Sequence, residues 1–408
     1  MSAADNRSTA AQRLKALLRD LPVGIWGLGL TSMFMDISSE LVHSLLPVLM
    51  SSVLGAGMLT IGLVEGFAEA TASITKLFSG SLSDRWGRRR PLLVLGYSMA
   101  ALTKPVFPLA GSIAAVAGAR CIDRVGKGIR GAPRDALIAD ITPPAQRGAA
   151  YGLRQALDSL GAALGPLLAI LGMVWLAGDV RAVMWVAVVP AFIAVALLLW
   201  MVKEPASVPH AARRPAPLSL AAVRQLKSRY WYITILGAVF TLARFSEAFL
   251  VLRAQQSGLS LTLVPLVMVV MNVIYAGAAY PAGHAADKRD PRLLLLAGLL
   301  LLVLADVVLA RATSARVVLV GAALWGLHMA LTQGLFSKLV ANAAPVELRG
   351  TAFGVFNFVT GISLLLSSAT AGVLWSSYGS AATFYAGAAF AVLTASGLLF
   401  TTLDQTRR

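Results

Sequence analysis

The chain has 408 residues, of which 57% are hydrophobic and only 13% are charged, and its mean hydropathy is +0.75. Because the charged share is about half that of a typical soluble domain, this composition excludes a soluble globular protein. The formal charge of +16 does not indicate nucleic-acid binding, since the basic residues lie in short gaps between apolar segments and not on one polar face.

Twelve segments are apolar and long enough to cross a bilayer, which takes about 20 residues per helix. Helices are expected at 22–50, 57–80, 91–110, 114–136, 146–173, 181–201, 230–255, 261–284, 292–311, 315–340, 350–376 and 380–402. The pattern predicts an all-α membrane protein of two six-helix bundles. Its expected parts are an N-terminal segment (1–21), a first bundle (22–202), a hydrophilic linker (203–229), a second bundle (230–402) and a tail (403–408).

The basic residues of the connecting segments are strongly asymmetric. On this segmentation 21 Lys and Arg fall on one side, and the other side receives only Arg181, Arg253, Arg311 and Arg316. The positive-inside rule therefore predicts cytoplasmic termini and a cytoplasmic linker in a bacterial inner membrane. The single Cys121 excludes an internal disulfide, and the first 20 residues lack the features of a signal peptide, so the first apolar segment is expected to remain as a membrane helix.

The two halves are weakly self-similar. GSLSDRWGRR, beginning at Gly80, is echoed by GHAADKRDPR, beginning at Gly283, at an offset of 203. Residues 137–152 match residues 339–354 at an offset of 202, and the pair Ser39–Glu40 parallels Ser246–Glu247. Repeated six-helix halves are typical of transporters whose binding site lies at the repeat interface, near the bilayer midplane.

The loop after the second helix, GSLSDRWGRRR, resembles the signature of the major facilitator superfamily. A glycine there allows close helix approach, and an aspartate is favoured at a helix start. The resemblance implies a gating role for this loop, its echo and the family's usual arginine in helix 4: Gly80, Asp84, Arg85, Arg89, Arg120, Gly283 and Asp287. The alternative is a charge cluster that only sets membrane orientation.

Two further motifs refine the resemblance. GAALGP, from Gly161 to Pro166, is similar to the glycine-proline motif of proton-coupled exporters, although Ala169 and Ile170 replace its usual glycine pair. Its alternative is ordinary packing of small residues around a proline kink. The run RCIDRVGKGIRGAPRDALIAD resembles a bacterial branch that includes nickel-resistance-like permeases, and here Arg124 replaces an expected glycine. The glycine-proline motif favours efflux, whereas the second resemblance names a branch rather than a substrate.

Ionisable residues are concentrated inside the helices of the first half. A charge at the bilayer centre costs ~2.5–3.5 kcal/mol on insertion scales, so these groups are expected to face a cavity and to pair. Across helices 1, 2, 4 and 5, seven carboxylates (Asp36, Glu40, Glu65, Glu69, Asp123, Asp135, Asp158) accompany seven cations (Lys76, Arg120, Arg124, Lys127, Arg130, Arg134, Arg154). Neither Lys104 nor Asp306 has an evident partner in the sequence.

These positions give the expected site. Proton coupling is assigned to Asp36, Glu40, Glu65, Glu69, Asp123 and Asp158. Substrate binding is assigned to Arg124, Lys127, Arg130, Arg154, Arg244, Glu247, Trp325, His328, Gln333, Phe336 and Asn357. The alternative is a purely structural ion-pair network near the cytoplasmic mouth. Neither a metal site nor a cofactor is expected, although His43 beside Asp36 and Glu40 leaves cation binding open.

The sequence thus predicts a monomeric secondary transporter and not an enzyme. Its partners are expected to be a small-molecule substrate, protons and membrane lipid, without nucleic acid. We expect alternating access with proton-coupled efflux. The alternatives are proton-coupled uptake of an anionic solute such as an organic acid or siderophore, because arginine suits carboxylate and phosphate, and, more distantly, a non-transporting receptor that reuses the fold.

Overall fold

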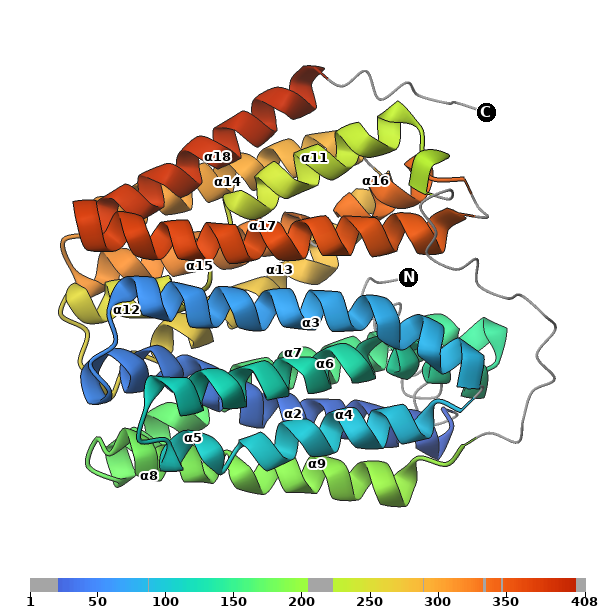
Figure 1. The fold of residues 1–408 in the computed structure, drawn as a ribbon, viewed down its shortest axis with the longest axis horizontal. Coiled ribbons are helices and arrows are strands. Elements are labelled where there is room, and N and C mark those ends of the chain that lie inside the picture. Colours follow the sequence, from blue (N-terminus) through green and yellow to red (C-terminus); the bar gives the residue numbers. More distant parts are fainter. Residues whose placement is uncertain are drawn as a thin grey trace, which may run out of the picture.

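The computed structural model describes residues 21–86, 88–204, 223–288, 290–332, 335–345 and 348–400, and these ranges contain helices but no strand. The expected segments 1–21, 203–229 and 403–408 therefore lie wholly or largely outside the described residues. Figure 1 shows two bundles side by side, with the first half from blue to green and the second from yellow-green to red.

Within the described ranges, each half contains six rods, some of them interrupted. The first half has α2 (Val23–Val48) continued by η1 (Leu49–Val53), α3 (Met58–Trp86), α4 (Arg90–Thr103) with α5 (Val106–Leu109), α6 (Ile113–Ile141), α7 (Arg147–Trp175), and α8 (Val180–Val186) with α9 (Val188–Met201). The second has α11 (Ser228–Leu242) with α12 (Ala248–Gln256), α13 (Leu266–Lys288), α14 (Pro291–Ala310), α15 (Ala315–Thr332) with α16 (Leu335–Ala343), α17 (Arg349–Tyr378) and α18 (Ser380–Phe400). The twelve expected segments correspond to these rods, so the all-α class is confirmed.

Eight of the described rods are long and apolar enough to span a membrane by length and composition alone. The other four are α3, α6, α11 with α12, and α13. Charged residues interrupt the apolar surface of α3 and α6, and the α11–α12 rod is broken. In Figure 1, α3 and α6 nevertheless run alongside their neighbours in the first bundle. Most of the expected site residues lie on these four rods.

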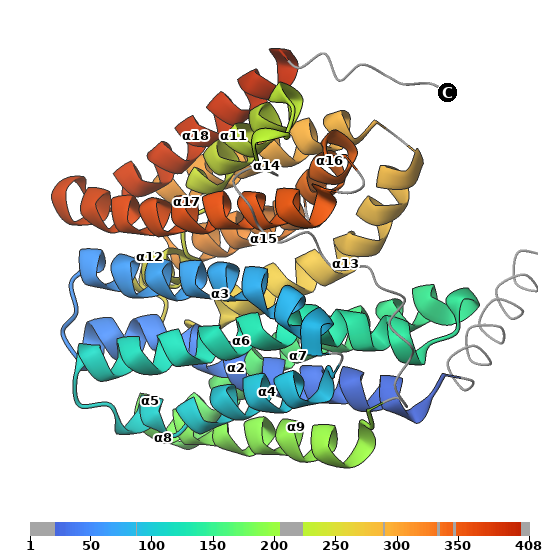
Figure 2. The ribbon, with the colours of Figure 1, turned by 45° about the vertical axis from the view of Figure 1, so that its right-hand side comes forward.

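The helices finish at two opposite ends of the molecule, which we call the linker end and the far end. Helices α3, α6, α9, α13, α16 and α18 finish at one end, called the linker end, and η1, α5, α7, α12, α14 and α17 finish at the opposite, far end. The halves meet along α3 with α17 and along α7 with α13. In Figure 2 the linker-end part of α13 turns away from α6 and α7. Pro281 lies inside this helix, and proline is a common cause of such bends.

The seventh rod is broken between Leu242 and Ala248. A break inside a membrane frees backbone groups that must find partners. Two serines of α17 supply them: Ser367 Oγ donates to Leu242 O at 2.9 Å, and Ser246 N donates to Ser368 Oγ at 3.2 Å. The break is therefore a built feature of the helix.

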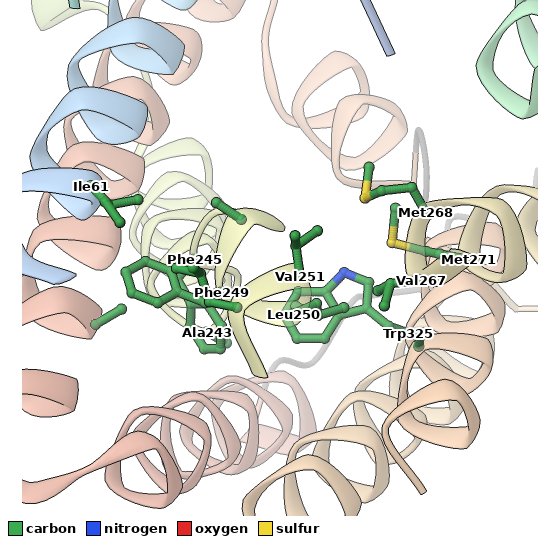
Figure 3. Packing of buried hydrophobic residues seen from close by; sticks show 14 of the residues in the cluster. Ile61, Ala243, Phe245, Phe249, Leu250, Val251, Val267, Met268, Met271 and Trp325 are labelled. Carbon is green, nitrogen blue, oxygen red and sulfur yellow. The ribbon is translucent and has the colours of Figure 1, made fainter. Parts of the chain in front are cut away.

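Aromatic side chains hold the broken segment in the core. Figure 3 shows Phe245 and Phe249 beside Trp325, in the buried cluster of the second half. The Phe245 ring centroid lies 5.5 Å from that of Trp325 and 5.7 Å from that of Phe249. This packing fixes the residues just before and after Phe245, which face the interface between the halves.

Candidate functional site

A cavity lies between the two halves. Its inner part, of about 360 Å³, is lined by Glu40, His43, Glu69, Arg124, Lys127, Ala162, Thr241, Arg244, Phe245, Ser246, Glu247, Asn272, Trp325, Met329 and Leu364. Its outer part, of about 470 Å³, shares Glu40, Lys127, Ala162, Asn272 and Met329 and extends along Asp36, Lys76, Arg130, Arg134, Arg154 and Asp158 toward the linker end. The two parts form one space, the central cavity.

The far end of this cavity is closed by close helix packing. A Cβ atom on Gly372 of α17 would lie 2.6 Å from Met58 O, and one on Gly66 of α3 would lie 3.0 Å from Leu365 Cα. Gln255 Nε2 also donates to Ser52 Oγ at 2.9 Å, across the two halves. The halves are thus in contact at the far end, and the outer part of the cavity extends toward the linker end.

Asp36 and Glu40 face the central cavity from α2, one helical turn apart. The GAALGP motif of α7 packs directly behind them. A Cβ on Gly161 would lie 2.5 Å from Met33 O and 3.1 Å from Asp36 Cβ, and one on Gly165 would lie 2.6 Å from Ile37 O and 2.9 Å from Glu40 Cβ. Glycine is required at both positions because any side chain would push α7 away from the acidic face of α2.

A chain of contacts between ionisable side chains runs from Glu40, on the cavity wall, into the interior of the first half. His43 Nδ1 lies 3.7 Å from Glu40 Oε2, and His43 Nε2 lies 3.7 Å from Glu65 Oε2. Arg120 Nη2 is 2.8 Å from Glu65 Oε2 and 3.7 Å from Glu69 Oε1. Glu65 is fully buried and does not line the cavity, whereas Glu69 does. Ser246 Oγ of the second half donates to Glu65 Oε2 at 3.5 Å, which ties this chain to the other bundle.

Arg124 continues the chain toward a second buried pair. Its Nη1 lies 3.2 Å from Glu69 Oε1, and its Nη2 lies 3.2 Å from Asp123 Oδ2. Lys104 Nζ lies 2.9 Å from Asp123 Oδ1 and donates to Ser39 Oγ at 3.0 Å. Lys104 thus has a partner that the sequence did not reveal. Asp123 is 2% exposed and lies behind the cavity wall.

A second cluster lines the outer part of the cavity. Arg154 Nη1 lies 2.7 Å from Asp135 Oδ1, and its Nη2 lies 2.8 Å from Asp158 Oδ2. Arg134 Nη1 lies 3.9 Å from Asp158 Oδ2. The buried Arg130 instead places its guanidinium 4.5 Å from the ring centroid of Tyr97, a cation–π contact.

The second half contributes a more apolar wall. Arg244, Glu247 and Trp325 line the inner part. His328 and Phe336 lie in the core: the His328 Nδ1 is 2.8 Å from Gly298 O, and Phe336 stacks on Phe240. Neither they nor Asn357 lines the central cavity. Gln333 lies outside the described residues.

The repeat-related glutamates Glu40 and Glu247 face the same space from opposite halves. Sequence reasoning missed several other lining residues: Thr241, Phe245, Ser246, Asn272, Tyr275 and Met329. Two of them gave a usable signal: Ser246 through its place in the repeat and Asn272 as an amide in an apolar helix. The Asn272 Nδ2 donates to Ala162 O of the other half at 3.0 Å.

Of the expected gating residues of the first half, Gly80 and Arg89 lie at the linker end, whereas Arg120 lies near the far-end start of α6, buried against Glu65. Arg89 Nε is 2.5 Å from Asp140 Oδ2 and its Nη1 donates to Ser83 Oγ, and both partners belong to the first half. Gly80 faces Ala132, at 3.5 Å from an added Cβ, and Gly283 has open space around it. The side chains of Asp84, Arg85 and Asp287 lie outside the described residues. Among the described residues, no group of three or more His, Cys, Asp or Glu could hold a metal ion.

Comparison with known proteins places this geometry in context. A family model described as the Major Facilitator Superfamily matches residues 28–368 and 248–408. An uncharacterised MFS-type transporter of Methanocaldococcus jannaschii is 30% identical over 393 residues, covering 94% of this chain and 96% of the relative. The multidrug resistance protein MdtH of Yersinia pestis is 25% identical over 306 residues, covering 74% of each.

Solved structures give the same architecture. A bacterial homologue of the human lysosomal transporter Spinster, in an inward-facing and unoccupied conformation, superposes with a TM-score of 0.75 at 15% identity, covering 92% of this chain and 95% of that one. At this level of identity the likeness supports the fold and not a shared substrate.

Proposed function

Because the chain belongs to the major facilitator superfamily, we propose that it is a proton-coupled secondary transporter that exports a small solute by alternating access. The central cavity is the solute path. Its linker end faces the cytoplasm of a bacterial cell, as the distribution of basic residues favours, and the transporter acts as a monomer in the inner membrane.

The observation that carries the proposal is the row of carboxylates on the cavity wall. Asp36, Glu40, Glu69 and Asp158 line the central cavity. Glu69 and Asp158 pair with Arg124 and Arg154, and Glu40 lies beside the titratable ring of His43. A carboxylate's proton affinity depends on its burial and on nearby charges. A movement of the halves that changes these partners therefore changes proton binding.

Two observations favour export. The Gly161 and Gly165 motif, which resembles that of proton-coupled exporters, packs against the helix that carries Asp36 and Glu40. In addition, a relative that aligns with 74% of this chain is named a multidrug resistance protein. These features connect the proposed proton site with the proposed direction of transport.

The direction is tested with proteoliposomes and a panel of labelled organic anions and cations. For a proton antiporter, an acidic interior should drive accumulation of at least one solute, relative to protein-free liposomes and to proteoliposomes without a gradient. Transport that is insensitive to the pH gradient would refute proton coupling.

Uptake of an anionic solute is the second candidate, favoured by the cations Lys127 and Arg244 on the cavity wall. The same assay separates the two directions, because a symporter should accumulate its solute when the interior is alkaline.

A further inference from the structure

The inner part of the central cavity contains charges that the protein does not neutralise by itself. Glu69 pairs with Arg124, and Glu40 approaches His43. Three lining groups, Lys127, Arg244 and Glu247, have no ion pair with any described residue. The inner part is lined by three carboxylates and three Lys or Arg residues, whereas the whole central cavity is lined by seven Lys or Arg residues and five carboxylates. The lining as a whole is therefore positive, and Lys127 and Arg244 are the cations of the inner part that have no ion pair with a described residue.

The two cations stand on opposite halves. Lys127 belongs to α6, and its side chain is exposed to the cavity between the paired Arg124 and the buried Arg130. Arg244 belongs to the break between α11 and α12. Its Nε is buried without a hydrogen-bond partner among the described residues, and its guanidinium carbon lies 5.6 Å from the Phe240 ring centroid. A buried donor without a partner is costly, so this group is suited to an external acceptor.

The break between α11 and α12 also favours binding of an external anion. Substrate sites of membrane transporters are typically formed by discontinuous helices, whose N-terminal ends favour anions. Here Ser246 and Glu247, which directly precede α12, line the inner part of the cavity.

Beside these polar groups lies an apolar surface. Phe245, Trp325, Met329 and Leu364 line the same inner part. The Trp325 Nε1 is buried without a hydrogen-bond partner among the described residues. The cavity therefore offers a cationic contact from each half and an aromatic wall.

We propose that the substrate is a small organic anion whose carboxylate or phosphate group lies between Lys127 and Arg244, with its apolar portion on Phe245 and Trp325. The proposal rests on the proposed transport function and assigns the substrate class. Guanidinium and ammonium groups both bind such anions, and arginine presents a fork that matches their oxygens. An anion held by both halves also stabilises the state in which the halves approach each other around it.

The test measures the charge preference of the cavity without requiring the natural substrate. In a Cys121→Ser background, Ala162→Cys places one thiol on the cavity wall, and Gly57→Cys places one on the exposed far-end loop as the reference. Each protein is treated with an anionic methanethiosulfonate (sulfonatoethyl) and a cationic one (trimethylammonioethyl). The measured quantity is the anion-to-cation ratio of reaction rates.

The ratio at Ala162→Cys should exceed the reference ratio by about tenfold, as expected for a cleft lined by one sign of charge. It should fall severalfold in Lys127→Gln and also in Arg244→Gln. Arg311→Gln, which removes the same charge from an exposed helix end, should leave it unchanged. Size-exclusion chromatography confirms that each variant is folded.

A ratio at or below the reference value, or a ratio that either cavity substitution leaves unchanged, would overturn the proposed two-sided anion site. This outcome is distinguishable from failure of proton-coupled export. Thiol reaction rates report the electrostatics of the cavity in protein that is not transporting, whereas the pH-gradient assay reports flux.

Discussion

At the scale of single residues, the charges inside the first half are stabilised because nearly every buried ionisable side chain has a partner. Lys104 with Asp123 and Arg120 with Glu65 are almost completely buried. Removing one member of a buried pair leaves an uncompensated charge, which costs more than replacing both members by apolar residues. These pairs form the rigid wall behind the cavity, in contrast to Glu40 and Glu69, which the cavity exposes in part.

Lys104→Met should therefore lower the free energy of unfolding, by at most ~3–5 kcal/mol, because Asp123 loses its nearest cation and keeps only Arg124. The double variant Lys104→Met/Asp123→Leu should recover part of this loss. Unfolding in detergent micelles measures both, with Lys203→Met on the exposed chain after α9 as the matched control. If Lys104→Met is as stable as Lys203→Met, the pair does not support the fold.

At the scale of elements, the contact between α2 and α7 sets the position of the cavity carboxylates. Gly161 and Gly165 let the backbones approach until no side chain fits between them. Small residues serve this purpose in membrane helices, where close van der Waals packing drives association. The glycine motif of α7 therefore positions Asp36 and Glu40.

Gly165→Ala tests this role. The new methyl group would lie 2.6 Å from Ile37 O and 2.9 Å from Glu40 Cβ, so α7 must shift at a cost of about 1–3 kcal/mol. A lower melting temperature and reduced pH-driven transport are expected. Gly152→Ala in the same helix has open space around the added atom and should be neutral or slightly stabilising, so equal effects of the two substitutions would argue against a packing role.

Some features of the helices could be predicted from the sequence, and others could not. Runs of apolar residues predicted the positions of the twelve described rods, although only eight of these are apolar enough to span a membrane by length and composition alone. The break before Ala248 escaped prediction since no Gly or Pro marks it, and its partners Ser367 and Ser368 are more than 100 residues away. The Lys104–Asp123 pair joins two helices whose relative rotation no periodicity specifies. Because the sequence does not specify the rotation of each helix, it also placed His328 and Phe336 on the substrate-binding wall. The structure instead buries both side chains away from the cavity.

At the scale of the whole molecule, the halves are in contact at the far end and enclose a cavity that extends toward the linker end. Contacts between halves at the far end include Gln255 with Ser52 and Gly372 with Met58. Alternating access requires these contacts to open while the linker end closes.

Locking the far end should therefore stop transport. In a Cys121→Ser background, Ser52→Cys/Gln255→Cys should be joined by a short bifunctional thiosulfonate, and solute flux should fall to the level of protein-free liposomes. A reducing agent should restore the flux, and each single-cysteine variant should be unaffected by the reagent. Full flux in the cross-linked protein would show that the far end does not need to open.

The central claim is that cavity carboxylates couple solute movement to protons, and Glu40→Gln tests it most directly. Glu40 lines both parts of the cavity and lies beside His43. Proteoliposomes containing this variant, the wild type or the control Glu204→Gln, whose carboxylate accepts bonds from Arg89 N and Arg90 N outside the cavity, are compared for pH-driven accumulation and for solute exchange without a gradient. We expect Glu40→Gln to lose pH-driven accumulation at least tenfold and to retain exchange, while Glu204→Gln keeps both. Undiminished pH-driven accumulation by Glu40→Gln would contradict the central claim.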